Sequence, residues 1–133
     1  MLIDQDAFPF PLAIVFVAIL ENELNKAQLP EGTGAILNFR DPNYSPETGG
    51  FHPVEIRINR NGLIEYVTDF AYVGVGPHAE LAKEIDFDIS LGIFQHFGRE
   101  FRIDKGRALF TLWQKNFISY YRMRVYRVEV EEG

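Results

Sequence analysis

Cysteine is absent from this chain of 133 residues. The protein therefore has no disulfide, no thiolate nucleophile and no cysteine-ligated zinc or iron–sulfur site. A chain without thiols is compatible with a reducing compartment, so the expected location is the cytoplasm.

Long apolar runs are lacking too. The most apolar stretch, from Pro9 to Leu20, has about a dozen residues, whereas a bilayer-spanning helix needs roughly 20. Asp4 and Asp6 precede it, where a secretory signal peptide carries lysine or arginine, and no small-residue cleavage site follows. The run therefore predicts a buried helix, and no membrane partner is expected.

The motifs of common enzyme classes are also missing. The chain has no P-loop, no GxGxxG after a strand, no GxSxG and no HExxH. His52, His78 and His96 lack the i, i+4 or i, i+2 spacing that brings metal ligands together. Neither a metal nor a cofactor is expected. A site assembled from distant segments, for example His52 with Asp69, stays open, but nothing in the sequence favours that pair.

Basic residues are scarce in the first three quarters of the chain. Residues 1–98 carry five Lys or Arg against fourteen Asp or Glu, whereas residues 99–133 carry eight against five, within a total charge of −6. An acidic protein is a poor partner for phosphate backbones, so nucleic-acid binding is not expected overall. The basic C-terminal third keeps a second alternative open, a weak single-stranded nucleic-acid binder using residues Arg122, Arg124 and Arg127 near Tyr120, Tyr121 and Tyr126. The simpler interpretation is that Trp113, Phe117 and Tyr120 pack in the core and the arginines form surface ion pairs.

Apolar residues are plentiful, at 47% of the chain with 14% aromatic, which predicts one globular domain over residues 1–133. Apolar residues recur at helical spacing over residues 11–28 and again from Asp104, a candidate N-cap, to about Tyr121. The second helix presents an apolar stripe made of Leu109, Phe110, Trp113, Phe117 and Tyr120.

Strand patterns occupy the middle and the end of the chain. Val54, Ile56 and Ile58 alternate with polar residues, and Asn61-Gly62 is typical of a two-residue hairpin turn leading into a strand over 63–73. Further strands are predicted at 34–39, 84–89 and 124–131, whereas residues 91–103 are ambiguous. The predicted fold class is α+β, with a mostly antiparallel sheet of four to six strands covered by two main helices.

Four segments resemble an uncharacterised family of short bacterial proteins, domain of unknown function 2787. They are NFRDPNYSPETGGFHPVEIRI (38–58), TDFAYVG, KEIDFD and LWQKNFISYY. The resemblance extends over most of the chain and implies a compact, soluble bacterial protein. It implies no catalytic residue, because the family has no assigned activity.

The loop from Arg40 to His52 is the first candidate site. It is longer than a usual hairpin connection, and long loops are often functional. Its candidate binding residues are Arg40, Asp41, Tyr44, Glu47 and His52. The loop also has the ordinary turn chemistry of a connector, with Asp41-Pro42, Ser45-Pro46 and Gly49-Gly50.

A second polar group is an alternating run of carboxylates, Glu84, Asp86 and Asp88, expected on one side of a strand. Three carboxylates there could bind a hard cation. The simpler interpretation is an ordinary solvent-facing side, where charges discourage edge-to-edge aggregation.

The leading functional hypothesis is a small cytoplasmic binding module without catalysis, which contacts a protein or a small ligand through loop 40–52. The first alternative is a small enzyme with a pocket near Arg40, Asp41 and His52. The two hypotheses differ in whether these side chains converge in a concave, partly apolar pocket.

Overall fold

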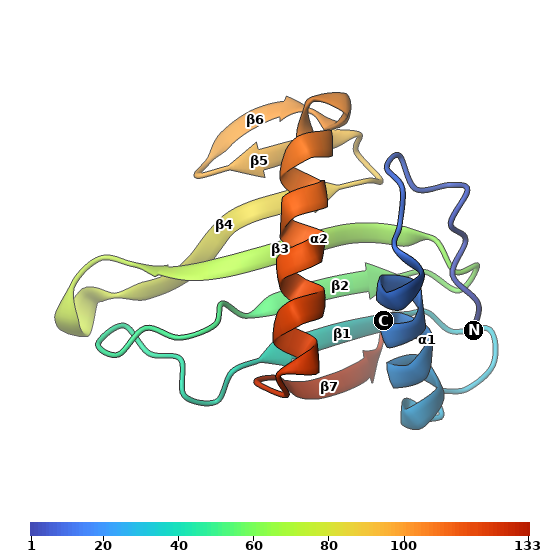
Figure 1. Ribbon diagram of the computed structural model, residues 1–133, viewed down its shortest axis with the longest axis horizontal. Helices are drawn as coiled ribbons and strands as arrows, with labels where there is room; N and C mark the ends of the chain where they lie inside the picture. Colours follow the sequence, from blue (N-terminus) through green and yellow to red (C-terminus); the bar gives the residue numbers. More distant parts are fainter.

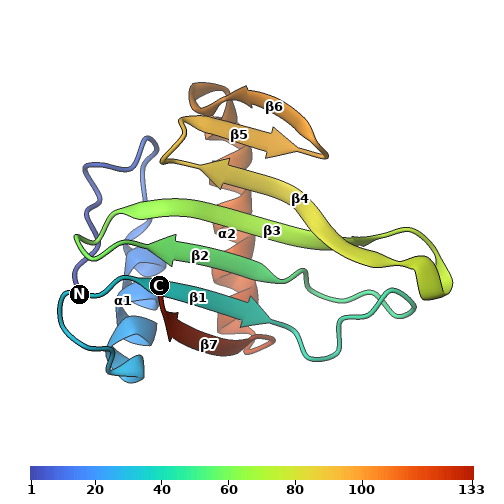
Figure 2. The same ribbon diagram turned by 180° about the vertical axis from the view of Figure 1, so that it is seen from behind.

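The computed structural model describes residues 1–133 as one antiparallel sheet covered on one face by two α-helices (Figure 1). The sheet has seven strands in the order β6-β5-β4-β3-β2-β1-β7. The elements are α1 (Ile14–Ala27), β1 (Ala35–Arg40), β2 (Val54–Ile58), β3 (Ile64–Val73), η1 (Gly76–His78), β4 (Glu80–Asp88), β5 (Ile93–His96), β6 (Arg99–Arg102), η2 (Ile103–Gly106), α2 (Arg107–Arg122) and β7 (Arg127–Glu132). Seen from behind, the other face of the sheet carries no helix (Figure 2). No helix combines the length and apolar content needed to cross a membrane.

The α+β class is confirmed, but the predicted four to six strands are too few. The ambiguous segment 91–103 contains the hairpin of β5 and β6, whose two-residue turn is Phe97-Gly98. Both turn residues have positive φ, 51° and 77°. Such turns usually carry Asn or Asp before Gly, so a phenylalanine there conceals the hairpin in the sequence.

The predicted hairpin between β2 and β3 is confirmed, but its turn is not the two-residue type. Only Gly62 has positive φ, and the Gly62 amide donates to the Asn59 carbonyl while the Asn59 amide donates to the Leu63 carbonyl. The connection therefore has three residues and ends on glycine in the left-handed conformation. A side chain at Gly62 would also clash with the Leu2 carbonyl, because the N-terminal segment lies against this turn.

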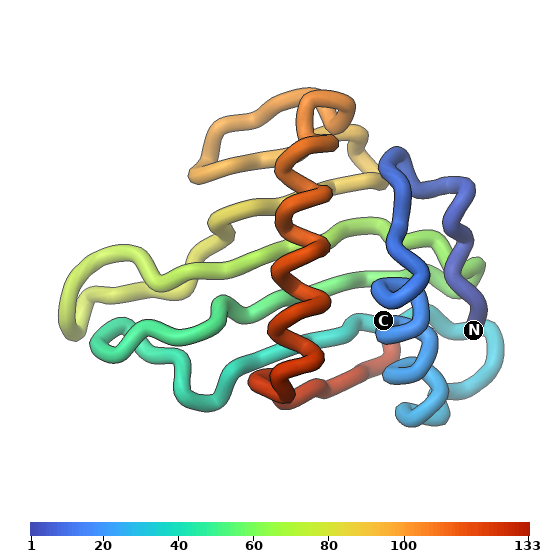
Figure 3. Tube along the Cα trace, in the orientation of Figure 1, coloured from blue at the N-terminus to red at the C-terminus, as the bar shows by residue number.

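The core lies between the sheet and the helices. Val54, Ile56 and Ile58 face it as predicted, and all three are buried. Helix α2 crosses the strands (Figures 1 and 3) and buries Phe110, Trp113 and Phe117 against them. The predicted stripe of α2 is confirmed, because Leu109 packs against the core and Tyr120 is half-buried.

Two side chains of the C-terminal helix bind α1. The Gln114 amide oxygen accepts a hydrogen bond from the Ala13 amide at 3.0 Å, and the Tyr121 hydroxyl donates to Glu23 at 2.7 Å. Burial and the Glu23 carboxylate raise the pKa of Tyr121 to about 12. Asp104, predicted as the cap of α2, instead pairs with Arg102 at 2.8 Å, because the helix begins at Arg107 after a 3₁₀ turn.

Two projections leave the same end of the sheet, the loop between β1 and β2 and the hairpin tip between β3 and β4 (Figure 3). Tyr44 connects them, since its hydroxyl accepts a hydrogen bond from the Tyr72 amide at 3.1 Å and the two rings stack with centroids 5.1 Å apart. The loop therefore lies along β3.

The packing of α2 predicts that alanine substitution of two phenylalanines lowers the stability of the protein by very different amounts. Phe110 is fully buried, so Phe110→Ala should lower the free energy of unfolding by about 3–5 kcal/mol. Phe97 is 65% exposed, so Phe97→Ala, the same chemical change, should cost less than about 1 kcal/mol. Urea denaturation measures both; similar losses in the two variants would contradict this placement of the core.

Candidate functional site

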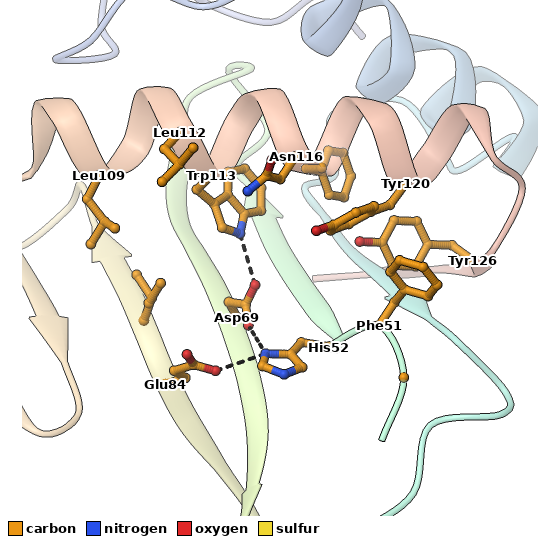
Figure 4. A pocket seen from close by; sticks show the side chains of 13 residues that line it. Phe51, His52, Asp69, Glu84, Leu109, Leu112, Trp113, Asn116, Tyr120 and Tyr126 are labelled. Atoms are coloured by element: carbon orange, nitrogen blue, oxygen red, sulfur yellow. Dashed lines mark hydrogen bonds and ion pairs between the residues drawn. The ribbon is translucent and has the colours of Figure 1, made fainter. Parts of the chain in front are cut away.

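A cavity of about 250 Å³ lies between α2, the middle of β3 and β4, and residues 50–52 of the loop. Its wall is largely aromatic and comes from the loop, the helix and the segment after it. The lining residues are Gly50, Phe51, His52, Asp69, Glu84, Ile85, Leu109, Leu112, Trp113, Asn116, Phe117, Tyr120 and Tyr126. Figure 4 shows His52, Asp69 and Glu84 converging at one end, with the aromatic rings beside them.

The Asp41 carboxylate shapes the loop that carries His52. It accepts hydrogen bonds from the Asn43 amide at 2.9 Å and from the Phe51 amide at 3.1 Å, so it joins the start of the loop to its end. Gly50 packs against it with φ of 137°, and a Cβ there would lie 2.9 Å from the Asp41 Oδ2 atom. Asp41 therefore positions the chain and does not line the cavity.

Residues at the end of the loop are also fixed by rings. Phe51 packs on Tyr120 of α2, with centroids 4.7 Å apart, and the Tyr44 ring lies 5.4 Å from the His52 ring. His52 remains 39% exposed on its side chain, so solvent reaches the cluster from this side.

Asp69 lies in the interior of the sheet, paired with Val54 of β2 and Ile85 of β4. Its side chain points to the helix-covered face. There Oδ2 accepts a hydrogen bond from the Trp113 indole nitrogen at 3.0 Å, and Oδ1 lies 3.1 Å from His52 Nδ1. The two oxygens thus connect the core tryptophan to the loop histidine.

A β-bulge places Glu84 beside Asp69. Asp69 pairs with Ile85 whereas the next residue, Phe70, pairs with Lys83, so Glu84 is the extra residue in β4. Bulges redirect side chains, and here the two consecutive residues Glu84 and Ile85 both line the cavity. The expectation that Glu84 shares a solvent-facing side with Asp86 and Asp88 is therefore wrong.

Asp86 differs from that expectation as well. It is only 5% exposed and accepts a hydrogen bond from the Thr68 hydroxyl at 2.7 Å.

Two carboxylates approach the same imidazole nitrogen. His52 Nδ1 lies 2.8 Å from Glu84 Oε2 and 3.1 Å from Asp69 Oδ1. A ring nitrogen carries at most one hydrogen, and the geometry directs it to Asp69. Glu84 Oε2 is fully buried and has no hydrogen-bond donor. It is an unsatisfied acceptor, which in a protein interior calls for a partner.

The cluster changes the proton affinity of nearby groups. The hydrogen bond to Asp69, and then the charges of Asp69 and Glu84, raise the pKa of His52 above 6.5 although partial burial opposes this. Burial and the negative charge of Asp69 raise the pKa of Tyr126. The cavity therefore has a strongly negative end that favours positive charge.

His52, Asp69 and Glu84 are also the residues that could hold a metal ion, because each offers one ligand atom and these atoms lie within 4.8 Å of one another. The sequence placed His52 among the candidates, gave no preference for Asp69, and grouped Glu84 with Asp86 and Asp88 on a solvent-facing side of a strand. One feature of the sequence does point to Asp69. It alternates in step with Val67, so it faces the core, and a carboxylate that faces the core needs a polar partner there.

The other predicted loop residues do not join this cluster. Arg40 and Glu47 are exposed, and neither forms an ion pair. Arg40 instead lies opposite Arg127 in the pairing of β1 with β7. The pocket near Arg40, Asp41 and His52 thus contains only His52 of the three.

The basic C-terminal segment has a different arrangement from the predicted one. Arg122, Arg124 and Arg127 are exposed and form no ion pairs, contrary to the expectation for them. Tyr121 and Tyr126 pack inward: the Tyr121 hydroxyl contacts Glu23, and Tyr126 packs on Phe117 with centroids 5.5 Å apart.

Comparison with known proteins identifies the family. Residues 15–131 match the model of a family described as "Protein of unknown function (DUF2787)". The chain belongs to this family. The resemblance noted from the sequence is thereby confirmed, and the family description assigns no activity.

Two solved structures share the fold. One is the hypothetical protein VC0508 from the Vibrio cholerae VSP-II pathogenicity island, with 33% identity and a TM-score of 0.79, covering 92% of this chain and 95% of that one. The other is the conserved hypothetical protein VC1805 from pathogenicity island VPI-2 of V. cholerae, with 36% identity and the same TM-score and coverage. That protein is described as sharing structural homology with the human P32 protein. No curated protein matches the chain.

The contact between His52 and Asp69 predicts a pH effect. In chelator-treated protein, Asp69→Asn should lower the pKa of His52, because the largest cause of its elevation is lost. Since the pKa is raised on folding, charged His52 stabilises the protein fully below about pH 6.5, and this contribution disappears as the pH rises through the folded-state pKa. An NMR titration of the His52 ring measures the shift.

Asp88→Asn, the same substitution in β4 but outside the cluster, should leave the His52 titration unchanged. An equal effect of the two variants would show that general charge, and not the Asp69 contact, controls the pKa of His52.

Proposed function

We propose that this protein is a non-catalytic binding module that takes a small, positively charged ligand in the cavity beneath α2. The observation that supports this most strongly is the convergence of two carboxylates on one imidazole nitrogen in an otherwise largely apolar cavity. The proposal keeps the binding module expected from the sequence but places the ligand behind the end of loop 40–52.

The negative charge of the cavity determines that the ligand is positively charged. With His52 protonated the cluster has a net charge of −1, and with His52 neutral it has −2, so either state attracts a cation. Trp113, Tyr120 and Tyr126 also line the cavity, and aromatic rings can attract a cation placed over their faces. An anionic ligand would meet repulsion from both carboxylates.

The size of the cavity restricts the ligand. Pockets for drug-sized molecules have volumes of about 300–1,000 Å³, and this one has about 250 Å³. A single ring with a charged substituent, or a small hydrated ion, fits this volume better than a peptide does.

Binding is better supported than the alternative of an enzyme using Arg40, Asp41 and His52. Arg40 is exposed, and Asp41 is occupied by two amides of its own loop. The cavity lining also contains no serine, threonine or lysine, so covalent group transfer through such a side chain has no support there.

Trp113 is the single tryptophan of the chain and lines the cavity, so its fluorescence reports on occupancy. Chelator-treated protein is titrated with four compounds that share one ring but differ in charge: benzylammonium, benzyltrimethylammonium, benzyl alcohol and benzoate. The two cations should produce saturable changes at concentrations at least about tenfold lower than the alcohol, and benzoate should produce none.

Two matched variants locate the effect. Glu84→Gln keeps the side-chain shape but removes a cavity charge, and should weaken cation binding about tenfold or more. Glu47→Gln makes the same change at an exposed position of the loop and should have no effect. Binding of benzoate or benzyl alcohol as tight as that of the cations, or equal effects of the two variants, would refute the proposal.

A further inference from the structure

We infer that the cation is a divalent transition-metal ion bound by His52 Nδ1 and one carboxylate oxygen each from Asp69 and Glu84. This inference rests on the proposed function and names the ligand class of the same cavity. The three residues come from the end of the loop, from β3 and from the bulge of β4, so the site exists only in the folded protein.

The distances within the cluster favour a metal ion over an organic ammonium group as its occupant. A metal ion with bonds of about 2.1 Å holds neighbouring ligand atoms about 3.0 Å apart in octahedral geometry and about 3.4 Å apart in tetrahedral geometry. An ammonium nitrogen needs about 2.8 Å to each acceptor, which spaces acceptors at tetrahedral directions about 4.6 Å apart. The observed separations are 2.8 Å and 3.1 Å from His52 Nδ1 to the two carboxylate oxygens.

These separations match ligands around one metal ion. They are too short for an ammonium group to lie among the three atoms, so an ammonium group would bind beside the cluster, next to the aromatic side chains of the cavity. A metal ion requires only that Nδ1 give up its proton, because the imidazole lone pair then becomes a ligand.

The buried Glu84 oxygen is an independent indication. Oε2 is fully buried, and its contact with His52 Nδ1 at 2.8 Å lacks hydrogen-bond geometry because the hydrogen of Nδ1 is directed at Asp69. An ion between the three groups would satisfy this oxygen. It would also balance the −2 charge of the cluster with neutral His52.

The groups around the cluster have two features of known metal centres, a hydrogen bond that orients a carboxylate and open space beside the ligands. Trp113 donates its indole hydrogen to Asp69 Oδ2 and leaves Oδ1 directed at the cluster, which is how outer groups orient metal-binding carboxylates. The adjoining cavity leaves room for the remaining coordination positions, as in open metal sites with three protein ligands.

The ligand set also selects among metals. Imidazole nitrogen suits Zn²⁺, Ni²⁺, Co²⁺ and Fe²⁺, whereas Mg²⁺ and Ca²⁺ are bound mainly by oxygen atoms. We therefore expect Zn²⁺ and Ni²⁺ to bind, and Mg²⁺ and Ca²⁺ not to compete at equal concentration.

Isothermal titration calorimetry on the untagged, chelator-treated full chain tests the inference. Zn²⁺ and Ni²⁺ should each bind in one equivalent. His52→Ala and Glu84→Gln should each weaken binding at least tenfold, in line with the losses seen when metal sites are altered. Circular dichroism and the melting temperature confirm that the variants are folded.

Matched controls use the remaining histidines and a neighbouring carboxylate. His78→Ala, His96→Ala and Glu80→Gln should bind Zn²⁺ like the unaltered protein, because none belongs to the cluster. Absence of Zn²⁺ and Ni²⁺ binding, or binding that survives in His52→Ala, overturns the inference.

Competition separates this inference from the proposed function. Zn²⁺ should displace benzylammonium from the cavity, as read by Trp113 fluorescence. If benzylammonium binds and depends on Glu84 but no metal ion binds, the metal inference fails and the proposed function stands. If neither kind of cation binds, both fail.

Discussion

The meeting of two carboxylates at one imidazole nitrogen is the constraint on which the chemistry of the cavity depends. Asp69 and Glu84 both lie about 3 Å from one imidazole nitrogen. Their oxygens lie within 4.8 Å of each other, and at an effective dielectric constant of about 20 two like charges about 4 Å apart repel each other by about 4 kcal/mol. A positive charge among them relieves that repulsion, whether it is the proton of His52 or a bound cation. The hydrogen bond to Asp69, followed by these negative charges, raises the pKa of His52, and the same charges favour the proposed ligand.

The fold holds the two carboxylates by different means. Asp69 is fixed by an interior strand and by the Trp113 indole, both parts of the buried core. Glu84 faces the cavity only because β4 carries one extra residue there. His52 is the least rigid member, since it lies on a loop and is positioned by Asp41, Phe51 and Tyr44. Two ligands on strands and one on a loop give a site that is largely preformed but can admit a ligand.

The features predicted from the sequence are those that depend on local pattern. The helices follow from apolar spacing, and the hairpin of β2 and β3 follows from alternation and a glycine turn. The β5–β6 hairpin was missed because Phe97 occupies a turn position that rarely accepts phenylalanine. The cluster was missed because His52 and Asp69 are 17 residues apart and Trp113 is 44 residues beyond Asp69. A bulge depends on strand pairing, so alternation alone assigns Glu84 to the wrong face.

The central claim is that a cation occupies the point where His52, Asp69 and Glu84 meet. The most direct measurement is a crystal structure of the protein grown with Zn²⁺, with anomalous diffraction recorded at the zinc absorption edge. Our account predicts an anomalous peak about 2.0–2.2 Å from His52 Nδ1 and from one oxygen of each carboxylate. A map with no peak there, in which His52 Nδ1 still donates its hydrogen bond to Asp69 while zinc lies elsewhere or is absent, would contradict it.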